Sequence, residues 1–199
     1  MLQVAAALFL ERGWAGTAMR AVAEGADVSL ATVELQFGTK AALLKAAIDV
    51  AIAGDAVPVP VLERGWADQA AAAPDAPRFL ELVADVLGPA QQRSAGLVLA
   101  VLEGATTDPR LGELAERLAA QRLGTATWIV RTLATKQPLR PDLAGEVGVE
   151  TLWTLMDPAV FDRLVRYRHW SVAGYQGWFA RSAAHLLLPD HPPPEGAPR

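Results

Sequence analysis

The sequence of 199 residues contains no cysteine. Disulfide bonds, thiolate metal sites and cysteine nucleophiles are therefore excluded, and this composition suits a reducing compartment. Long apolar runs are also missing, because the longest uncharged apolar stretch, residues 94–102, is far shorter than the roughly 20 residues that span a bilayer. No basic residue precedes the first apolar run, as a secretory signal would require. With 52% hydrophobic residues, the sequence predicts a folded cytoplasmic protein with no membrane partner.

Proline is absent before Pro58, whereas five of the fourteen prolines lie in residues 189–199. A tail of this kind neither continues a helix nor joins a sheet, so we expect it to be disordered. Pro58 and Pro60 indicate an extended connector, and Pro77 marks a second break. Between these breaks alanine and leucine dominate at helical spacing and strand patterns are nearly absent. The sequence therefore predicts an all-α fold.

Signals for the start of a helix recur after the connector. Asp75 and Asp108 are typical N-caps, each followed by a proline in the first turn, and leucines recur after Asp108 at i, i+3 and i+7. Ser171 precedes a last helix in which Arg181 is the only formally charged residue. A helix with so little charge must pack against other helices on more than one side, which favours a second copy of the chain as its partner. A central core helix within one chain is the alternative.

The first 55 residues show a series of short helices. One is expected to end at Gly13, and Thr17, Ser29 and Thr39 are expected to cap the next three. Two short helices joined by a tight turn, the second exposed on its outer face, form a helix-turn-helix, which places its second helix in the DNA major groove. The positions expected to face inward are Val4, Leu8, Phe9, Met19, Val22, Ala23, Val33, Phe37, Leu43, Leu44, Ala47 and Ile48.

Residues 7–48, ALFLERGWAGTAMRAVAEGADVSLATVELQFGTKAALLKAAI, resemble the DNA-binding domain of the TetR/AcrR family of transcriptional regulators. The matching elements are LF–ERG–aromatic–x–x–T, then A–x–V–S–x–x–T, then F–x–x–K–x–x–L–L. Residues 152–188 look like the C-terminal region of many actinobacterial-type members, with an aromatic segment that ends in Arg-x-Trp-Ser before a final helix.

The resemblance implies an all-α homodimer that binds a double-stranded DNA operator. Residues 1–47 would form an N-terminal three-helix helix-turn-helix head, and residues 48–188 a C-terminal helical ligand-binding and dimerisation body. The last two helices, Leu143–Met156 and Ser171–Leu188, would form the dimer interface. A small apolar or amphipathic ligand in the body would shift the spacing of the two heads.

The resemblance also implies which residues meet DNA. Thr17 and Thr32 match threonines whose hydroxyl meets phosphate, and Lys40 matches a lysine that reaches the DNA backbone. For Thr17 an N-cap role, and for Lys40 a solvated helix charge, are the alternatives. Gln36 is the best candidate base reader, because its amide can pair with adenine. The expected DNA-binding residues are Thr17, Ser29, Leu30, Ala31, Thr32, Leu35, Gln36 and Lys40.

The sequence departs from the family pattern at the same surface. Leu30, Ala31, Glu34 and Gln36 stand where members commonly have lysine, glycine, tyrosine and histidine. Glu34 would repel phosphate, and the basic arm that usually precedes the first helix is missing. Residues 1–47 carry four basic and four acidic side chains and hence no net charge. We expect only about three to four phosphate contacts per head.

By family position, a ligand cavity would lie between helices around residues 78–88, 90–104, 109–135 and 142–156. Apolar side chains would line it and two charged ones would anchor the ligand, although ordinary core packing or a solvated charge is the alternative for each. The candidates are Phe79, Leu102, Glu103, Trp128, Arg131 and Trp153.

An enzyme is not expected, because the three histidines show no metal-ligand spacing and the sequence has neither a Gly-rich phosphate loop nor a nucleophile elbow. No metal or cofactor is expected either. The resemblance instead implies a ligand-responsive DNA-binding transcriptional regulator, by analogy a repressor released by a small molecule. The alternative is a dimeric helical small-molecule-binding module with a weakened or vestigial head.

Overall fold

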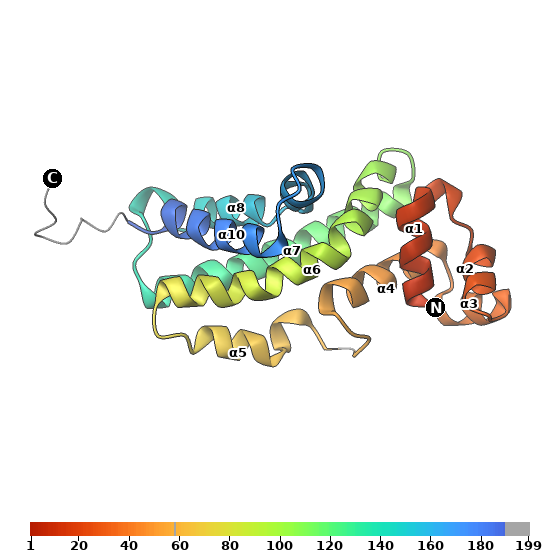
Figure 1. Ribbon diagram of the computed structural model, residues 1–199, viewed down its shortest axis with the longest axis horizontal. Coiled ribbons are helices and arrows are strands. Elements are labelled where there is room, and N and C mark those ends of the chain that lie inside the picture. Colours follow the sequence, from red (N-terminus) through yellow and green to blue (C-terminus); the bar gives the residue numbers. More distant parts are fainter. Residues whose placement is uncertain (58, 190–199) are drawn as a thin grey trace, which may run out of the picture.

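The computed structural model describes residues 1–57 and 59–189, and this part of the chain is helical without any strand, as the sequence predicts. The molecule is elongated, with α1 to α4 gathered at one end and a larger bundle at the other (Figure 1). The helices are α1 (Leu2–Gly16), α2 (Met19–Gly25), α3 (Leu30–Phe37), α4 (Lys40–Ala53), α5 (Gly65–Ala71), α6 (Ala76–Gly104), α7 (Pro109–Lys136), α8 (Glu146–Leu155), α9 (Pro158–Phe161) and α10 (Val172–Leu187), with short helical turns η1 (Val61–Glu63), η2 (Pro141–Leu143) and η3 (Asp162–Tyr167).

Local capping chemistry determines most helix starts. Ser29 accepts the backbone N–H of Thr32 at 3.1 Å at the start of α3, and Thr39 caps α4 in the same way. Asp75, Asp108 and Ser171 likewise cap α6, α7 and α10. These caps confirm the starts predicted from the sequence, since Ser, Thr and Asp side chains satisfy the free N–H groups of a first helical turn.

The α1 helix breaks where the sequence predicts a stop. Gly13 has φ 66° and ψ −174°, a backbone conformation that favours glycine, and one further turn follows to Gly16. The expected cap at Thr17 is wrong, because the N-cap of α2 is Ala18 and no side chain caps it. Thr17 is turned inward instead, and its contacts are described below.

The body differs from expectation at two prolines. Residues 78–88 and 90–104, expected as two helices, form the single helix α6 with Pro89 inside it. The helix continues across Pro89 because both of its halves are held by packing, the first in the body and the second against α1 and α4. The expected extended connector is also wrong after η1, since residues 65–71 form α5. Its Trp66 donates to the carbonyl of Val61 and lies 5.4 Å from the ring of Trp128.

The helix expected from residue 142 onward is shorter than predicted. It begins at Glu146, after Gly145 in a left-handed conformation, and ends at Leu155. Asp157 then caps the short helix α9, which runs directly into the π-helical turn η3. The last helix, α10, buries one face along α6 and exposes the other, so it is not a central core helix within one chain.

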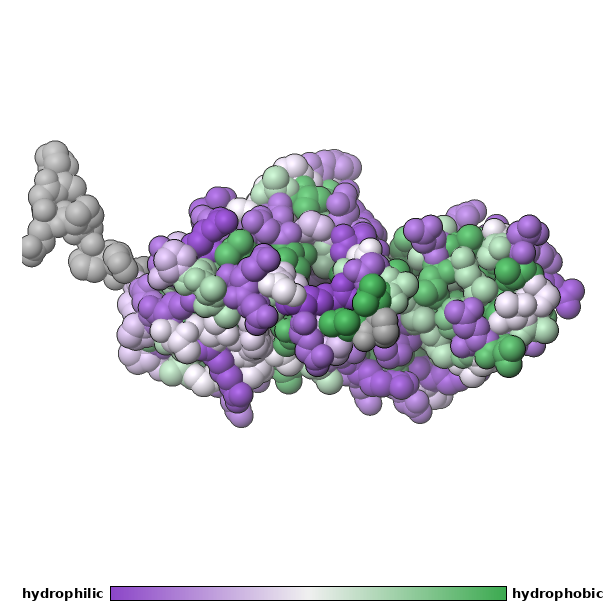
Figure 2. Space-filling view, turned by 90° about the horizontal axis from the view of Figure 1, so that it is seen from below, coloured by the Kyte–Doolittle hydropathy of each residue, from purple (hydrophilic) through white to green (hydrophobic). Residues whose placement is uncertain are grey.

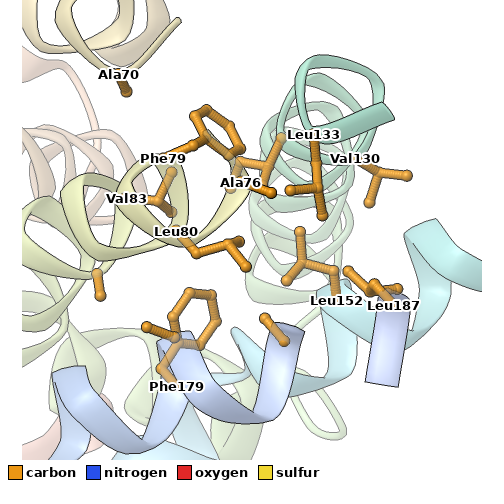
Figure 3. Close-up of a cluster of buried hydrophobic side chains, with 14 of the residues drawn as sticks. Ala70, Ala76, Phe79, Leu80, Val83, Val130, Leu133, Leu152, Phe179 and Leu187 are labelled. Atoms are coloured by element: carbon orange, nitrogen blue, oxygen red, sulfur yellow. The ribbon is translucent and has the colours of Figure 1, made fainter. Parts of the chain in front are cut away.

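Two large apolar clusters stabilise these helices. In the body, side chains of α6, α7, α8 and α10 point toward one another, including Phe79, Leu133, Leu152, Phe179 and Leu187 (Figure 3). The second cluster joins buried residues of α1 to α4 with one end of α6 and of α7. The head therefore shares its core with the body, because the buried apolar surface is continuous between them. Residues 190–199 of the expected tail lie outside the described residues, and the domain boundary at residue 47 stays a prediction.

Candidate nucleic-acid interface

Helices α2 and α3 form the helix-turn-helix expected from the sequence. The chain turns between them at Asp27, which has φ 53°, and the backbone N–H of Val28 donates to the carbonyl of Ala23 at 3.0 Å. Asp tolerates this left-handed conformation better than most residues. Val22 and Ala23 of α2 and Val33 of α3 are buried together in the head core. This packing leaves one side of α3 facing away from the protein (Figure 1).

The outer side of α3 carries the candidate DNA-contacting side chains. Ala31, Thr32, Glu34, Leu35 and Gln36 are exposed, and Leu35 is 91% exposed. The hydroxyls of Ser29 and Thr32 lie 2.8 Å apart and share a hydrogen bond at the first turn. Leu30 is half-buried against the head core. The structure therefore brings six of the eight expected residues, Ser29, Leu30, Ala31, Thr32, Leu35 and Gln36, onto one short helix and its cap.

Thr17 lies apart from this surface. It is only 1% exposed, and its hydroxyl lies 3.0 Å from the carbonyl oxygen of Leu8 and 2.9 Å from that of Gly13. The carbonyl of Gly13 lies at the break in α1, where the backbone acceptor lacks its regular helical partner. The hydroxyl thus serves as an internal donor that closes α1 around its break at Gly13. Because the hydroxyl bonds to these backbone carbonyls, the Thr17 side chain lies inside the head and not on its surface.

Lys40 is half-buried and holds α4 against α1. Its ammonium group donates to the carbonyls of Trp14 at 2.7 Å and Thr17 at 3.0 Å, and it lies 4.0 Å from the centre of the Trp14 ring. Desolvation by burial lowers the pKa of Lys40, and the nearby charge of Asp108 opposes this shift. Two of the three N–H donors are therefore engaged within the protein. Contact of the third with DNA stays a prediction.

The sequence analysis missed the link between the head and α7. The indole N–H of Trp14 donates to the carboxylate of Asp108 at 3.1 Å, across 94 residues of sequence. Asp108 also accepts from Arg110, and this side-chain hydrogen bond is the main cause of the lowered pKa of Asp108. The aromatic residue after ERG and the cap of α7 were each visible in the sequence. Their pairing was not, because it depends on the packing of α1 against the far end of the body.

The structure does not bring the expected ligand-binding residues together in one place, and their role in ligand binding stays a prediction. Leu102 and Glu103 are exposed near the end of α6, about 35 Å along the helix from Phe79. Arg131 is exposed on α7. The reason is that α6 is one continuous helix, so residues expected on two adjacent helices lie at its opposite ends.

Three of these residues do lie inside the body. Phe79 is fully buried, and its ring lies 5.9 Å from that of Trp128. Trp153 covers the guanidinium of Arg122 at 4.3 Å from its ring centre. No helix of the described ranges, 1–57 and 59–189, has the length and apolarity needed to cross a bilayer.

Comparisons with known proteins agree with this architecture. Residues 1–47 match the family model for bacterial regulatory proteins of the tetR family. A crystal structure of a TetR-family transcriptional regulator from Rhodococcus sp. is similar with a TM-score of 0.70 and 17% identity, over 94% of this chain and 95% of that one. A transcriptional regulator from Saccharomonospora viridis, crystallised with choline, is similar with a TM-score of 0.66 and 18% identity, over 95% and 96% of the two chains.

A third similar structure is the ketosteroid transcriptional regulator KstR2 of Mycobacterium tuberculosis, with a TM-score of 0.56 and 17% identity over 95% of this chain and 93% of that one. None of the curated proteins matches the sequence. The fold is therefore that of helical regulators with an N-terminal helix-turn-helix. Residues 1–47 thus match the pattern of the tetR family of bacterial regulatory proteins, which confirms the resemblance seen in that part of the sequence.

The internal role of Thr17 leads to a first prediction. Thr17→Val keeps the shape of the side chain but removes the single O–H donor that the carbonyls of Leu8 and Gly13 share, so it should lower the free energy of unfolding by about 1–2 kcal/mol. Thermal or urea unfolding measures this loss, with Thr135→Val on the exposed face of α7 as control. The salt dependence of DNA binding should not change. A slope that falls by about one instead would show that the hydroxyl contacts phosphate.

Glu34 leads to a second prediction, because it places a negative charge on the exposed side of α3. Glu34→Lys should raise affinity for duplex DNA by about three- to tenfold at 0.1 M salt and steepen the salt slope by about one per head. Fluorescence anisotropy with labelled duplex measures both. Glu81→Lys, at an exposed position near the start of α6 in the body, makes the same change in net charge away from the head. Equal gains in the two variants would contradict a DNA-facing position for Glu34.

Proposed function

We propose that the chain is a ligand-responsive DNA-binding regulator of transcription, a repressor that a small molecule releases from its operator. The observation that carries this proposal is the outer side of α3, which is capped at Ser29 and presents polar side chains around a leucine that is 91% exposed. At this position on the outer side of α3, the methyl group of thymine would offer the leucine an apolar contact in the major groove. The regulator acts in the cytoplasm and performs no catalysis.

In this proposal residues 1–47 are the DNA-binding head and residues 48–188 the ligand-binding and dimerisation body. Ser29, Ala31, Thr32, Leu35 and Gln36 meet DNA, the hydroxyls on phosphate and the amide on a base edge. Lys40 adds its remaining donor, and Leu30 supports α3 from the half-buried side.

Two copies of the chain pair through residues 143–156 and 171–188 in this proposal. Support comes from α10, whose outward side carries Ala173, Gly174 and Ala184 and only one formally charged residue, Arg181. Small side chains permit close approach of a second copy. A dimer places its two α3 helices about one turn of duplex apart, roughly 34 Å, which a single head does not achieve.

The ligand is proposed to bind in the body. One structurally similar regulator was crystallised with choline, and another is named a ketosteroid transcriptional regulator. These chemistries differ so much that neither is transferred to this chain. The proposal is limited to a small apolar or amphipathic molecule.

A second function is favoured by one observation. The head has no net charge and presents Glu34 on α3, as a small-molecule-binding protein with a vestigial head would. A selection of bound fragments from genomic DNA, carried out with the full chain, separates the two functions. Enrichment of a distinct sequence supports the regulator. Retention of no sequence by either the natural chain or Glu34→Lys supports the vestigial head.

The charge balance of the head leads to a third prediction. Three to four phosphate contacts per head correspond to about six to eight per dimer, and hence to a slope of log K against log salt near −5 to −7. Titration of a selected duplex across a range of salt concentrations measures the slope. A value of −10 or steeper would require phosphate contacts that a neutral head does not provide, and it would contradict this account of the interface.

Leu35 leads to a fourth prediction. Leu35→Ala should weaken binding to the selected operator by about five- to tenfold, because it removes an apolar contact with base edges, and leave binding to unrelated duplex unchanged. Leu123→Ala on α7 is the matched control, since Leu123 is also an exposed leucine. The melting temperatures of both variants should equal that of the natural chain. An equal loss on operator and unrelated DNA would place Leu35 outside base readout.

A further inference from the structure

The junction between α8 and α9 collects polar side chains from three other helices. Gln91 of α6 donates to the backbone carbonyl of Met156 at 2.7 Å inside the protein. Arg122 of α7 forms an ion pair with Asp157 at 2.8 Å. Tyr175 of α10 is fully buried, and the charge of Asp157 acts on it. We call these five residues, Gln91, Arg122, Met156, Asp157 and Tyr175, the polar joint.

Two donors of the polar joint are unpaired. Among the described residues, the Nε atom of Arg122 and the hydroxyl of Tyr175 are buried without a hydrogen-bond partner. Desolvation and, next, the charge of Asp157 raise the pKa of Tyr175, so its hydroxyl keeps the proton and remains a donor. Buried donors without an acceptor are rare and cost free energy in a folded protein. Two of them at one junction indicate that an acceptor is missing.

The groups around the polar joint are aromatic and apolar. The ring of Trp153 covers the guanidinium of Arg122 at 4.3 Å. Phe161 meets Tyr175 edge to face at 4.9 Å, and the ring of Trp178 lies 5.9 Å from that of Tyr175. An acceptor that enters here is therefore surrounded by ring faces and edges, which suits a molecule with a flat apolar skeleton.

The backbone at the polar joint is also irregular. Helix α8 ends at Leu155, Asp157 caps the four-residue helix α9, and the π-helical turn η3 follows. Breaks of this kind let short segments shift without the loss of a long run of helical hydrogen bonds. The junction thus places irregular backbone and two unpaired donors next to the apolar core, to which Met156 belongs together with Phe79 and Leu133 (Figure 3).

We propose that the polar joint is the effector site and that it takes an uncharged molecule whose carbonyl-type oxygen accepts from the buried Tyr175 hydroxyl; this inference rests on the proposed ligand-responsive function. The apolar part of the molecule lies against Trp153, Phe161 and Trp178. The charges already present at the site disfavour the binding of ionic ligands. Arg122 and Asp157 already neutralise each other, so a carboxylate would add a second anion beside Asp157 and an ammonium would face the guanidinium.

Three probes of similar size test the chemistry of the site. Acetophenone carries a neutral carbonyl, ethylbenzene lacks it, and benzoate carries a charge. Tryptophan fluorescence of the full chain without DNA reports binding, since Trp153 and Trp178 border the site. Acetophenone should bind about fivefold or more tightly than either other probe, the effect of one hydrogen bond to a buried donor. No binding of acetophenone up to its solubility limit, or equal binding of acetophenone and ethylbenzene, overturns the proposal.

Two variants test whether the Tyr175 hydroxyl causes the preference for acetophenone. Tyr175→Phe should bind acetophenone about fivefold more weakly and ethylbenzene unchanged. Tyr167→Phe is the matched control, because Tyr167 is the only other tyrosine and is 76% exposed. It should retain the natural preference. A Tyr175→Phe chain that still prefers acetophenone contradicts the assignment.

The melting temperature of the protein without any probe distinguishes a ligand-binding role of the Tyr175 hydroxyl from a purely structural role. If the hydroxyl of Tyr175 has no acceptor in the free protein, Tyr175→Phe should melt at the same temperature as the natural chain or higher. Acetophenone should then raise the melting temperature of the natural chain and of Tyr167→Phe but not of Tyr175→Phe. A lower melting temperature for Tyr175→Phe would show that the hydroxyl bonds to a permanent structural partner, and the proposal would fail.

The failure of this inference is distinguishable from that of the proposed function. The probe experiments use no DNA, and the genomic selection uses no probe. A chain that selects an operator but does not bind acetophenone refutes the site and leaves the DNA-binding regulator. A chain that binds acetophenone through Tyr175 but selects no DNA supports the site and refutes the regulator.

Discussion

The contact of the Lys40 ammonium with the end of α1 holds the helices of the helix-turn-helix head together. It donates to the carbonyls of Trp14 and Thr17, and it lies over the indole of Trp14, whose N–H reaches Asp108 at the start of α7. One set of contacts therefore joins α4, α1 and α7. Helices α2 and α3 follow directly from α1 and lead directly into α4. The orientation of α3 consequently depends on these few polar contacts and on the apolar core beneath them.

Helix α6 connects that core to the interior of the body, since it contributes to both large apolar clusters and runs along the length of the molecule (Figure 1). Near its middle, two residues face different partners. Gln91 donates to Met156 at the polar joint, and Arg93 donates to the carbonyls of Ala51 and Ile52 at the end of α4. A shift of α6 caused by a ligand at the joint would thus act within two residues on the helix that carries the head. This is a physical route for coupling, since the same rigid element contacts both sites.

The helix starts were predictable from the sequence because capping is local. Ser29 and Asp75 each satisfy N–H groups within three residues, so their role does not depend on the rest of the fold. The outer side of α3 was predictable for the same reason, from the spacing of Val33 and its neighbours. The inward turn of Thr17 and the continuity of α6 through Pro89 were not, because distant packing decides both. The polar joint was also invisible, since its side chains come from four separate segments of the chain.

The low net charge of the head bears on how much binding free energy a ligand at the polar joint must supply. Phosphate contacts supply most of the sequence-independent affinity of a DNA-binding protein, and a head with few of them binds unrelated DNA weakly. Operator affinity then depends on base contacts of α3 from two heads at a fixed spacing. A ligand must supply only its differential binding free energy to change that spacing. In the proposed regulator, a small electrostatic part of DNA binding would allow a modest ligand-driven shift of α6 to release both heads, and a ligand held by a hydrogen bond and a few aromatic rings would provide free energy of that order.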